Sequence, residues 1–95
     1  MHFVIEAIDR PGTEDLRQAT RADHLAYLER TGVTRIAGPF LSDDGLPIGS
    51  LLIIEAENMA AAEAFAAADP YAKAGLFVVT VIRPWRWVIG RPEGA

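Results

Sequence analysis

Residues 33–57, VTRIAGPFLSDDGLPIGSLLIIEAE, decide the fold, because two apolar runs lie on either side of a polar turn. The runs 33–41 and 49–57 are rich in β-branched and other apolar residues, and the intervening SDDGLP is typical of a turn. We therefore predict a β-hairpin. Gly38 and Pro39 lie inside the first run, and they predict a break there, because proline cannot donate to a strand ladder.

A helix-forming segment lies on each side of this hairpin. Residues 13–31 combine good helix formers with an acidic first turn and stop at Gly32. Residues 58–69 open with the capping residue Asn58, are mostly alanine, and end where Pro70 excludes a helical conformation from the residue before it. The hairpin is thus expected between two helices.

The first predicted helix has a candidate cap at Thr13 and a broad apolar face. We expect that face to cover the sheet, with two further large side chains, Tyr27 and Leu28, directed toward the other side. The residues of the expected face are Leu16, Ala19, Ala22, Leu25 and Ala26.

Two more strand-like segments flank the helices. Residues 2–9 precede a turn, and residues 77–89 form a long apolar run interrupted by Pro84, followed by a tail over 90–95. The resulting order β-α-β-β-α-β predicts an α+β, ferredoxin-like fold, in which both helices cover one face of an antiparallel sheet. One domain is expected to include all of residues 1–95.

Composition excludes several classes of function. A net charge of −4 argues against nucleic acid and anionic membranes as partners, and the lack of cysteine removes thiol chemistry and cysteine zinc sites. His2 and His24 are the only histidines and have no ligands at metal-site spacing, and no glycine-rich phosphate loop is present. We therefore expect no metal, no cofactor and no membrane span, and a cytoplasmic protein.

The predicted strands carry too many apolar residues for a sheet that is covered on one face only. VIEAI, LLIIE and VVTVI do not alternate cleanly with polar residues, a pattern typical of strands buried on both faces. We expect the open face to meet a second copy of the chain, which gives a homodimer. Trp85 and Trp87 alternate with Arg86 and are expected near that interface.

His24 is the one histidine away from the start of the sequence, and histidine is the side chain type that titrates near neutral pH. Arg21 precedes it by one helical turn, so both side chains emerge on the same side. One interpretation places the two on a solvated helix face. The other requires a carboxylate that orients the imidazole, for which Asp69 is a candidate by its chemistry.

Five short motifs occur in a fixed order along the chain. They are R-x-x-H-L-x-x-L (21–28), A-G-P (37–39), G-S (49–50), D-P-Y-x-x-A-G (69–75) and a late-strand Pro84 followed by an aromatic residue. This ordered set resembles the YciI-like, YCII-related domain family, and the likeness extends over nearly the whole chain. The resemblance implies the dimeric α+β barrel variant of the ferredoxin-like fold.

The resemblance also implies a site. In that family the histidine and aspartate matched by His24 and Asp69 form an acid/base pair in a cleft, and the serine matched by Ser50 lies nearby as a polar contact. One member class eliminates chloride from a chlorinated hydroxyhydroquinone. The connection 42–48, SDDGLPI, is shorter than is typical of the family, so the substrate class does not carry over with the motifs.

These observations lead to two main functional hypotheses. The first is a cofactor-independent lyase or isomerase in which the carboxylate fixes the imidazole tautomer and the imidazole transfers a proton. Arg21 would hold an anionic or phenolic ligand, and Gly38 and Pro39 would bring backbone close to it, unless they only form a bulge. Tyr71 is either a ligand contact or packing over the end of the second helix.

The second hypothesis is a non-catalytic homodimer that uses the same cleft to bind a small ligand or to serve as an accessory protein. It is motivated by how few chemical groups the sequence offers. A third interpretation is an interaction module in which Trp85 and Trp87 recruit a partner.

Overall fold

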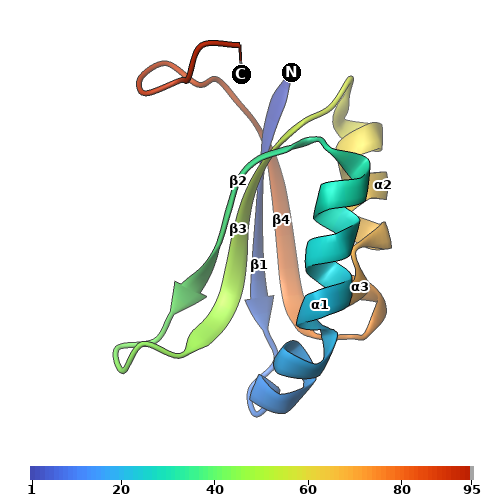
Figure 1. The fold of residues 1–95 in the computed structure, drawn as a ribbon, viewed down its shortest axis with the longest axis vertical. Coiled ribbons are helices and arrows are strands. Elements are labelled where there is room, and N and C mark those ends of the chain that lie inside the picture. Colours follow the sequence, from blue (N-terminus) through green and yellow to red (C-terminus); the bar gives the residue numbers. More distant parts are fainter. Residues whose placement is uncertain (95) are drawn as a thin grey trace.

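The structure, a computed structural model, describes residues 1–94. Its elements are β1 (His2–Asp9), α1 (Glu14–Thr31), β2 (Thr34–Leu41), β3 (Pro47–Glu55), α2 (Met59–Ala68), α3 (Pro70–Lys73) and β4 (Phe77–Trp85). The four strands form one antiparallel sheet in the order β2-β3-β1-β4, and the helices lie on one side of it (Figure 1). The predicted α+β, ferredoxin-like fold is confirmed.

Two crossovers produce this strand order. The chain passes from β1 through α1 to β2, and from β3 through α2 and α3 to β4, so each helical connection skips one strand. Side chains from the two central strands meet under the helices, where Ile5 pairs with Leu52 and Phe3 with Ile54. These four residues and Ala62 of α2 form the hydrophobic core.

The side of α1 that faces the sheet differs from the expected one. Its buried residues are Arg17, His24 and Tyr27, whereas the expected stripe is largely exposed, including Leu25, which is 44% exposed. Positions 17, 24 and 27 share a helical face because they differ by seven and three residues. The buried residues of α1 therefore have the spacing of one helical face, but this face consists of polar and aromatic side chains.

Thr13 does not cap α1 with its side chain. It precedes the first helical residue, but its hydroxyl donates to the Arg10 carbonyl oxygen and makes no capping hydrogen bond. By contrast, Asn58 caps α2 as predicted, since its side chain accepts from the Ala61 N–H at 2.9 Å. The chain after α2 makes one further helical turn, α3, before Gly75 turns it with a φ of +76°.

β2 continues through Gly38 and Pro39, so the predicted break is wrong. The register is regular there, with Gly38 opposite Leu51 and Pro39 opposite Ser50, and the irregularities lie near the two ends of the strand. β2 is an edge strand. Because an edge strand pairs on one side only, it tolerates a residue without an N–H.

The last strand is shorter than predicted. β4 includes Pro84 but ends at Trp85, and residues 86–94 form no helix or strand. The Trp87 indole N–H donates to the Ile89 carbonyl oxygen at 3.0 Å, and the rings of Trp85 and Trp87 lie 5.8 Å apart. The hairpin strand β3 is also shifted, starting at Pro47 instead of residue 49.

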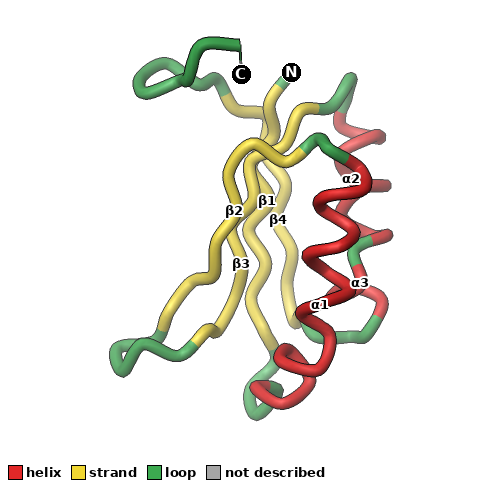
Figure 2. The backbone as a smooth tube through the Cα atoms, in the orientation of Figure 1, coloured by secondary structure: helices red, strands yellow, loops and turns green. Residues whose placement is uncertain are grey.

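The sheet face opposite the helices is open within residues 1–94 (Figure 2). It is mostly apolar, although the register also places Glu6 and Arg83 on it, and several of its apolar side chains are half-exposed, such as Ile36 at 42% and Val79 at 46%. By register, the apolar residues of this open sheet face include Val4, Ile8, Ile36, Leu51, Ile53, Val79 and Val81.

No helix in the described part of the chain is long and apolar enough to cross a membrane.

Candidate active site

A pocket of about 460 Å³ lies between α1 and the strands β2 and β3. This volume is within the usual range for small-molecule sites. The pocket contains both apolar and charged side chains. Its lining is Glu14, Arg17, Gln18, Arg21, His24, Leu25, Leu28, Ala37, Gly38, Pro39, Leu46, Pro47, Ser50, Leu52 and Tyr71.

His24 and Asp69 form a hydrogen bond at one side of this pocket. His24 Nδ1 lies 2.9 Å from Asp69 Oδ1, and the two residues are 7% and 4% exposed. His24 therefore does not lie on a solvated helix face. The same Asp69 oxygen accepts the Tyr71 backbone N–H at 2.9 Å, so Asp69 caps α3 while it contacts the imidazole.

This contact fixes the imidazole tautomer. A carboxylate oxygen that accepts hydrogen bonds requires the hydrogen of a neutral His24 ring on Nδ1, which leaves a lone pair on Nε2. Nε2 makes no hydrogen bond within residues 1–94, and His24 lines the pocket. The imidazole therefore offers the pocket a proton acceptor, while Asp69 lies behind it and does not line the pocket.

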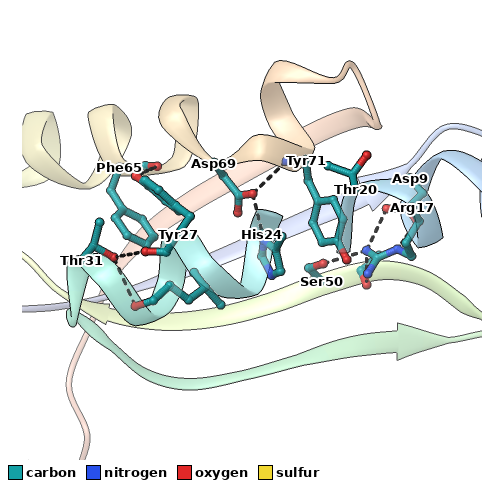
Figure 3. A network of polar contacts seen from close by, with 12 residues as sticks. Asp9, Arg17, Thr20, His24, Tyr27, Thr31, Ser50, Phe65, Asp69 and Tyr71 are labelled. Carbon is teal, nitrogen blue, oxygen red and sulfur yellow. Dashed lines mark hydrogen bonds and ion pairs between the residues drawn. The ribbon is translucent and has the colours of Figure 1, made fainter. Parts of the chain in front are cut away.

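Tyr71 lies between His24 and Arg17 (Figure 3). Its ring stacks on the imidazole with 4.0 Å between centroids and 20° between planes, and the Arg17 guanidinium lies 4.7 Å from the ring centroid. Burial raises the pKa of the Tyr71 hydroxyl above its usual value, while Arg17 and Arg21 oppose that rise. Tyr71 is thus both a packing residue and part of the pocket wall.

Arg17 is a buried pocket residue that the sequence patterns do not identify. It is buried and forms a two-pronged ion pair with Asp9, through Nε at 2.7 Å and Nη2 at 3.1 Å. Nη2 also donates to Ser50 Oγ at 2.7 Å and to the Gly49 carbonyl oxygen at 2.9 Å. Its spacing of two helical turns before His24 is the one signal in the sequence that places both residues on a common face.

The structure explains why a glycine precedes Ser50 in β3. A Cβ atom at Gly49 would lie 2.5 Å from the Ala7 carbonyl oxygen, so this position takes only glycine. Ser50, the next residue, is buried and lines the pocket, and its role as a polar contact to a ligand stays a prediction. The close approach of β3 to β1 thereby positions the two acceptors that β3 offers to Arg17, the Gly49 carbonyl oxygen and Ser50 Oγ.

The remaining predicted site residues also line the pocket. Arg21 is exposed on α1, as the solvated interpretation expects, but it borders the pocket one turn before His24. Gly38 and Pro39 contribute the β2 side, and nothing lies within 4 Å of where a Gly38 Cβ would be. Within residues 1–94, no group of three histidine, aspartate or glutamate side chains could hold a metal ion.

Known proteins are similar to this chain over most of its length. A family model of the YCII-related domain matches residues 1–86. An uncharacterised protein of Haemophilus influenzae is 37% identical over 97 residues, which cover 93% of this chain and 99% of that protein. Protein YciI of Escherichia coli is 35% identical with the same coverage.

Solved structures extend the likeness. The 5-chloro-2-hydroxyhydroquinone dehydrochlorinase of Burkholderia phenoliruptrix, in complex with 2,5-dihydroxybenzoquinone, has a TM-score of 0.83 and 40% identity, covering 90% of this chain and 94% of that chain. An antibiotic biosynthesis monooxygenase, with a TM-score of 0.58 and 14% identity over 93% of this chain and 99% of its own, shares the fold alone. By its fold, its motifs and these matches, the chain belongs to the YCII-related domain family.

Proposed function

We propose that this protein is a cofactor-independent small-molecule enzyme, a lyase or isomerase, that uses His24 and Asp69 as an acid/base pair. The observation that carries the proposal is the 2.9 Å contact from His24 Nδ1 to Asp69 Oδ1 at the wall of the pocket. A carboxylate behind an imidazole holds the ring in one tautomer and stabilises the imidazolium that forms when the other nitrogen takes a proton.

In the proposed reaction, His24 Nε2 removes a proton from an acidic O–H or C–H of the ligand. The electron pair left behind moves into the conjugated system of the ligand. A lyase then loses a leaving group with its electron pair, and the proton on His24 passes to solvent. An isomerase returns the same proton to another carbon of the ligand.

The pocket supports a phenolic or quinonoid ligand with an ionised oxygen. Leu25, Leu28 and Pro39 offer apolar surface for a flat ring, and Arg21 places a cation at the same pocket. The structural relative that removes chloride from a chlorinated hydroxyhydroquinone supports the same class. The short connection 42–48 contains Leu46, which lines the pocket. The edge of the pocket therefore has a shape specific to this chain, and its ligand can differ from that of the structural relative.

We also propose a homodimer through the open sheet face. That face is mostly apolar, and its half-exposed Ile36 and Val79 belong to opposite edge strands. A large apolar patch on one protein surface favours association, and packing of two such sheets would bury it. A cytoplasmic location stays a prediction.

Variants of the acid/base pair test the proposed activity. His24→Gln and Asp69→Asn are each expected to lower kcat by about 10²- to 10⁴-fold on a chlorinated hydroxyhydroquinone, followed by chloride release and by absorbance of the quinone product. His2→Gln is the matched control, because His2 is also buried but does not line the pocket.

Wild-type turnover in both His24→Gln and Asp69→Asn would rule out the acid/base role. A non-catalytic binding protein would give a different result. It would bind 2,5-dihydroxybenzoquinone saturably, and it would form no product from any chlorinated or unsaturated phenol supplied to it.

A further inference from the structure

Arg17 is a buried charged residue of the pocket that the acid/base pair does not use. Its guanidinium makes two contacts with Asp9, one with Ser50 Oγ and one with the Gly49 carbonyl oxygen. The charge of Arg17 is compensated by Asp9, and its position is fixed from three directions. The guanidinium therefore acts as a fixed donor to Ser50 and not as a mobile group for capturing anions.

This contact determines what the Ser50 hydroxyl can do. A guanidinium only donates hydrogen bonds, so Ser50 Oγ is the acceptor in its 2.7 Å contact with Arg17. A serine hydroxyl has one hydrogen of its own, and no acceptor within residues 1–94 takes it. Because Ser50 lines the pocket, its proton is available to an oxygen atom of a ligand.

The Tyr71 hydroxyl is in the same situation. It makes no hydrogen bond within the part of the chain that the structure describes, and Tyr71 lines the pocket. Figure 3 shows the ring extending from α3 between His24 and Arg17, with its hydroxyl end directed toward Ser50. Stacking on the imidazole fixes the ring, and the raised pKa keeps the hydroxyl protonated at neutral pH.

We propose that Ser50 and Tyr71 form a pair of hydroxyl donors for one ligand oxygen, and that Arg17 is the positioning residue that directs the Ser50 proton into the pocket. This rests on the proposed function, because the oxygen in question gains negative charge when His24 removes a proton. Donors fixed in advance around such an oxygen stabilise the charge that develops on it.

The proposed step balances without any further reactant. The ligand proton passes to His24 Nε2, and the electron pair of the broken bond moves through the conjugated ligand onto the oxygen held by Ser50 and Tyr71. Both hydroxyls keep their own protons. The ligand class is therefore a planar compound whose carbonyl oxygen is conjugated with the atom that loses the proton.

Equilibrium binding of 2,5-dihydroxybenzoquinone tests the donor pair without turnover. In a titration at neutral pH, Ser50→Ala and Tyr71→Phe are each expected to weaken binding about tenfold. The matched controls are Thr31→Val and Tyr27→Phe, which remove hydroxyls bonded to backbone carbonyls outside the pocket. They should bind within about twofold of wild type.

Arg17 requires a test that separates positioning from direct contact. Arg17→Lys is expected to weaken binding about tenfold in the wild-type chain. In a Ser50→Ala chain the same substitution should change the affinity by no more than about twofold, because Arg17 acts on the ligand only by orienting the Ser50 hydroxyl. Arg30→Lys is the control, since Arg30 lies over the Tyr27 ring as Arg17 lies over Tyr71. If Arg17→Lys does not fold, Asp9→Asn with Arg17→Met removes the ion pair as a unit.

Three results would overturn the proposal: wild-type protein that does not bind the quinone saturably, unchanged binding by both hydroxyl variants, or an equal loss from Arg17→Lys in both backgrounds. These outcomes are distinct from failure of the proposed function. Wild-type turnover by His24→Gln would end the acid/base proposal whatever the titration gave. Failure of the titration while His24 is essential would remove only the donor pair.

Discussion

At the scale of single residues, two buried ionisable pairs hold the pocket together. Arg17 of α1 meets Asp9 of β1, and His24 of α1 meets Asp69 at the start of α3. Burying a charge is costly unless a partner and further hydrogen bonds compensate it. Here Ser50 and the backbone supply those hydrogen bonds, so these polar residues tolerate burial.

The buried tyrosines predict how stability responds to alkaline pH. Burial raises the pKa of Tyr27 and of Tyr71 in the folded protein. Up to about pH 10 both folded and unfolded chains keep these protons, but above it the unfolded chain releases protons that the folded chain retains. The free energy of unfolding is therefore expected to fall as pH rises through that range.

Urea unfolding from about pH 9 to about pH 11 measures this effect. The double variant Tyr27→Phe with Tyr71→Phe should show a shallower decline than wild type, because phenylalanine does not titrate. Equal slopes for the two proteins would show that other groups cause the alkaline loss.

At the scale of elements, the sequence predicts which helices and strands form, and in what order, better than it predicts which side of a helix faces the sheet. The hairpin, both long helices and their order follow from turn residues, caps and apolar runs. The buried face of α1 does not, because Arg17, His24 and Tyr27 occupy it. The spacing of apolar residues indicates a face of alanines and Leu25 instead. Such a pattern does not include a polar side chain that is buried because its partner lies on another element.

In the candidate site, too, the sequence predicts some residues and misses others. The resemblance to the family identifies His24, Asp69 and Ser50, because these three residues lie in the ordered motifs. Arg17 lies in no such motif, and its partner Asp9 is the last residue of a strand. Only the register of β1 and β3 brings Asp9, Gly49 and Ser50 around one guanidinium, and sequence patterns do not specify register.

The first residues of α2 and α1 predict different losses of stability when the residue before each helix is replaced by alanine. Asn58→Ala removes a side-chain cap on α2 and is expected to cost about 1 kcal/mol in the free energy of unfolding. Thr13→Ala is expected to cost less, because the Thr13 hydroxyl makes no capping bond to α1. Denaturant titration of the two variants beside wild type measures the difference. A larger loss for Thr13→Ala would contradict this assignment of the caps.

At the scale of the whole molecule, the two faces of the sheet have different roles. The helix face carries the core and the pocket, whereas the open sheet face exposes apolar side chains from all four strands. A domain this small buries a modest part of its surface alone. Association through the open face would therefore add stability from the side of the sheet opposite the pocket.

A charge on the open face tests this association. Val79→Lys is expected to convert a dimer into single chains, because a buried lysine without a partner opposes sheet packing. Ala26→Lys, on the exposed side of α1, is the control and should remain dimeric. Sedimentation equilibrium reports the mass directly. A wild-type protein with the mass of one chain, or a dimeric Val79→Lys variant, would count against the open sheet face as the interface.

Asp69 also determines where the chain tolerates a change of length. One of its oxygens serves both the imidazole of His24 and the first turn of α3. A residue inserted into α2 would rotate everything beyond it by about 100° and carry this oxygen away from the ring. The hairpin turn after β2 carries no such constraint, although Leu46 and Pro47 beside it border the pocket. Insertions and deletions there can reshape the rim for a new ligand while the groups that handle protons stay where they are.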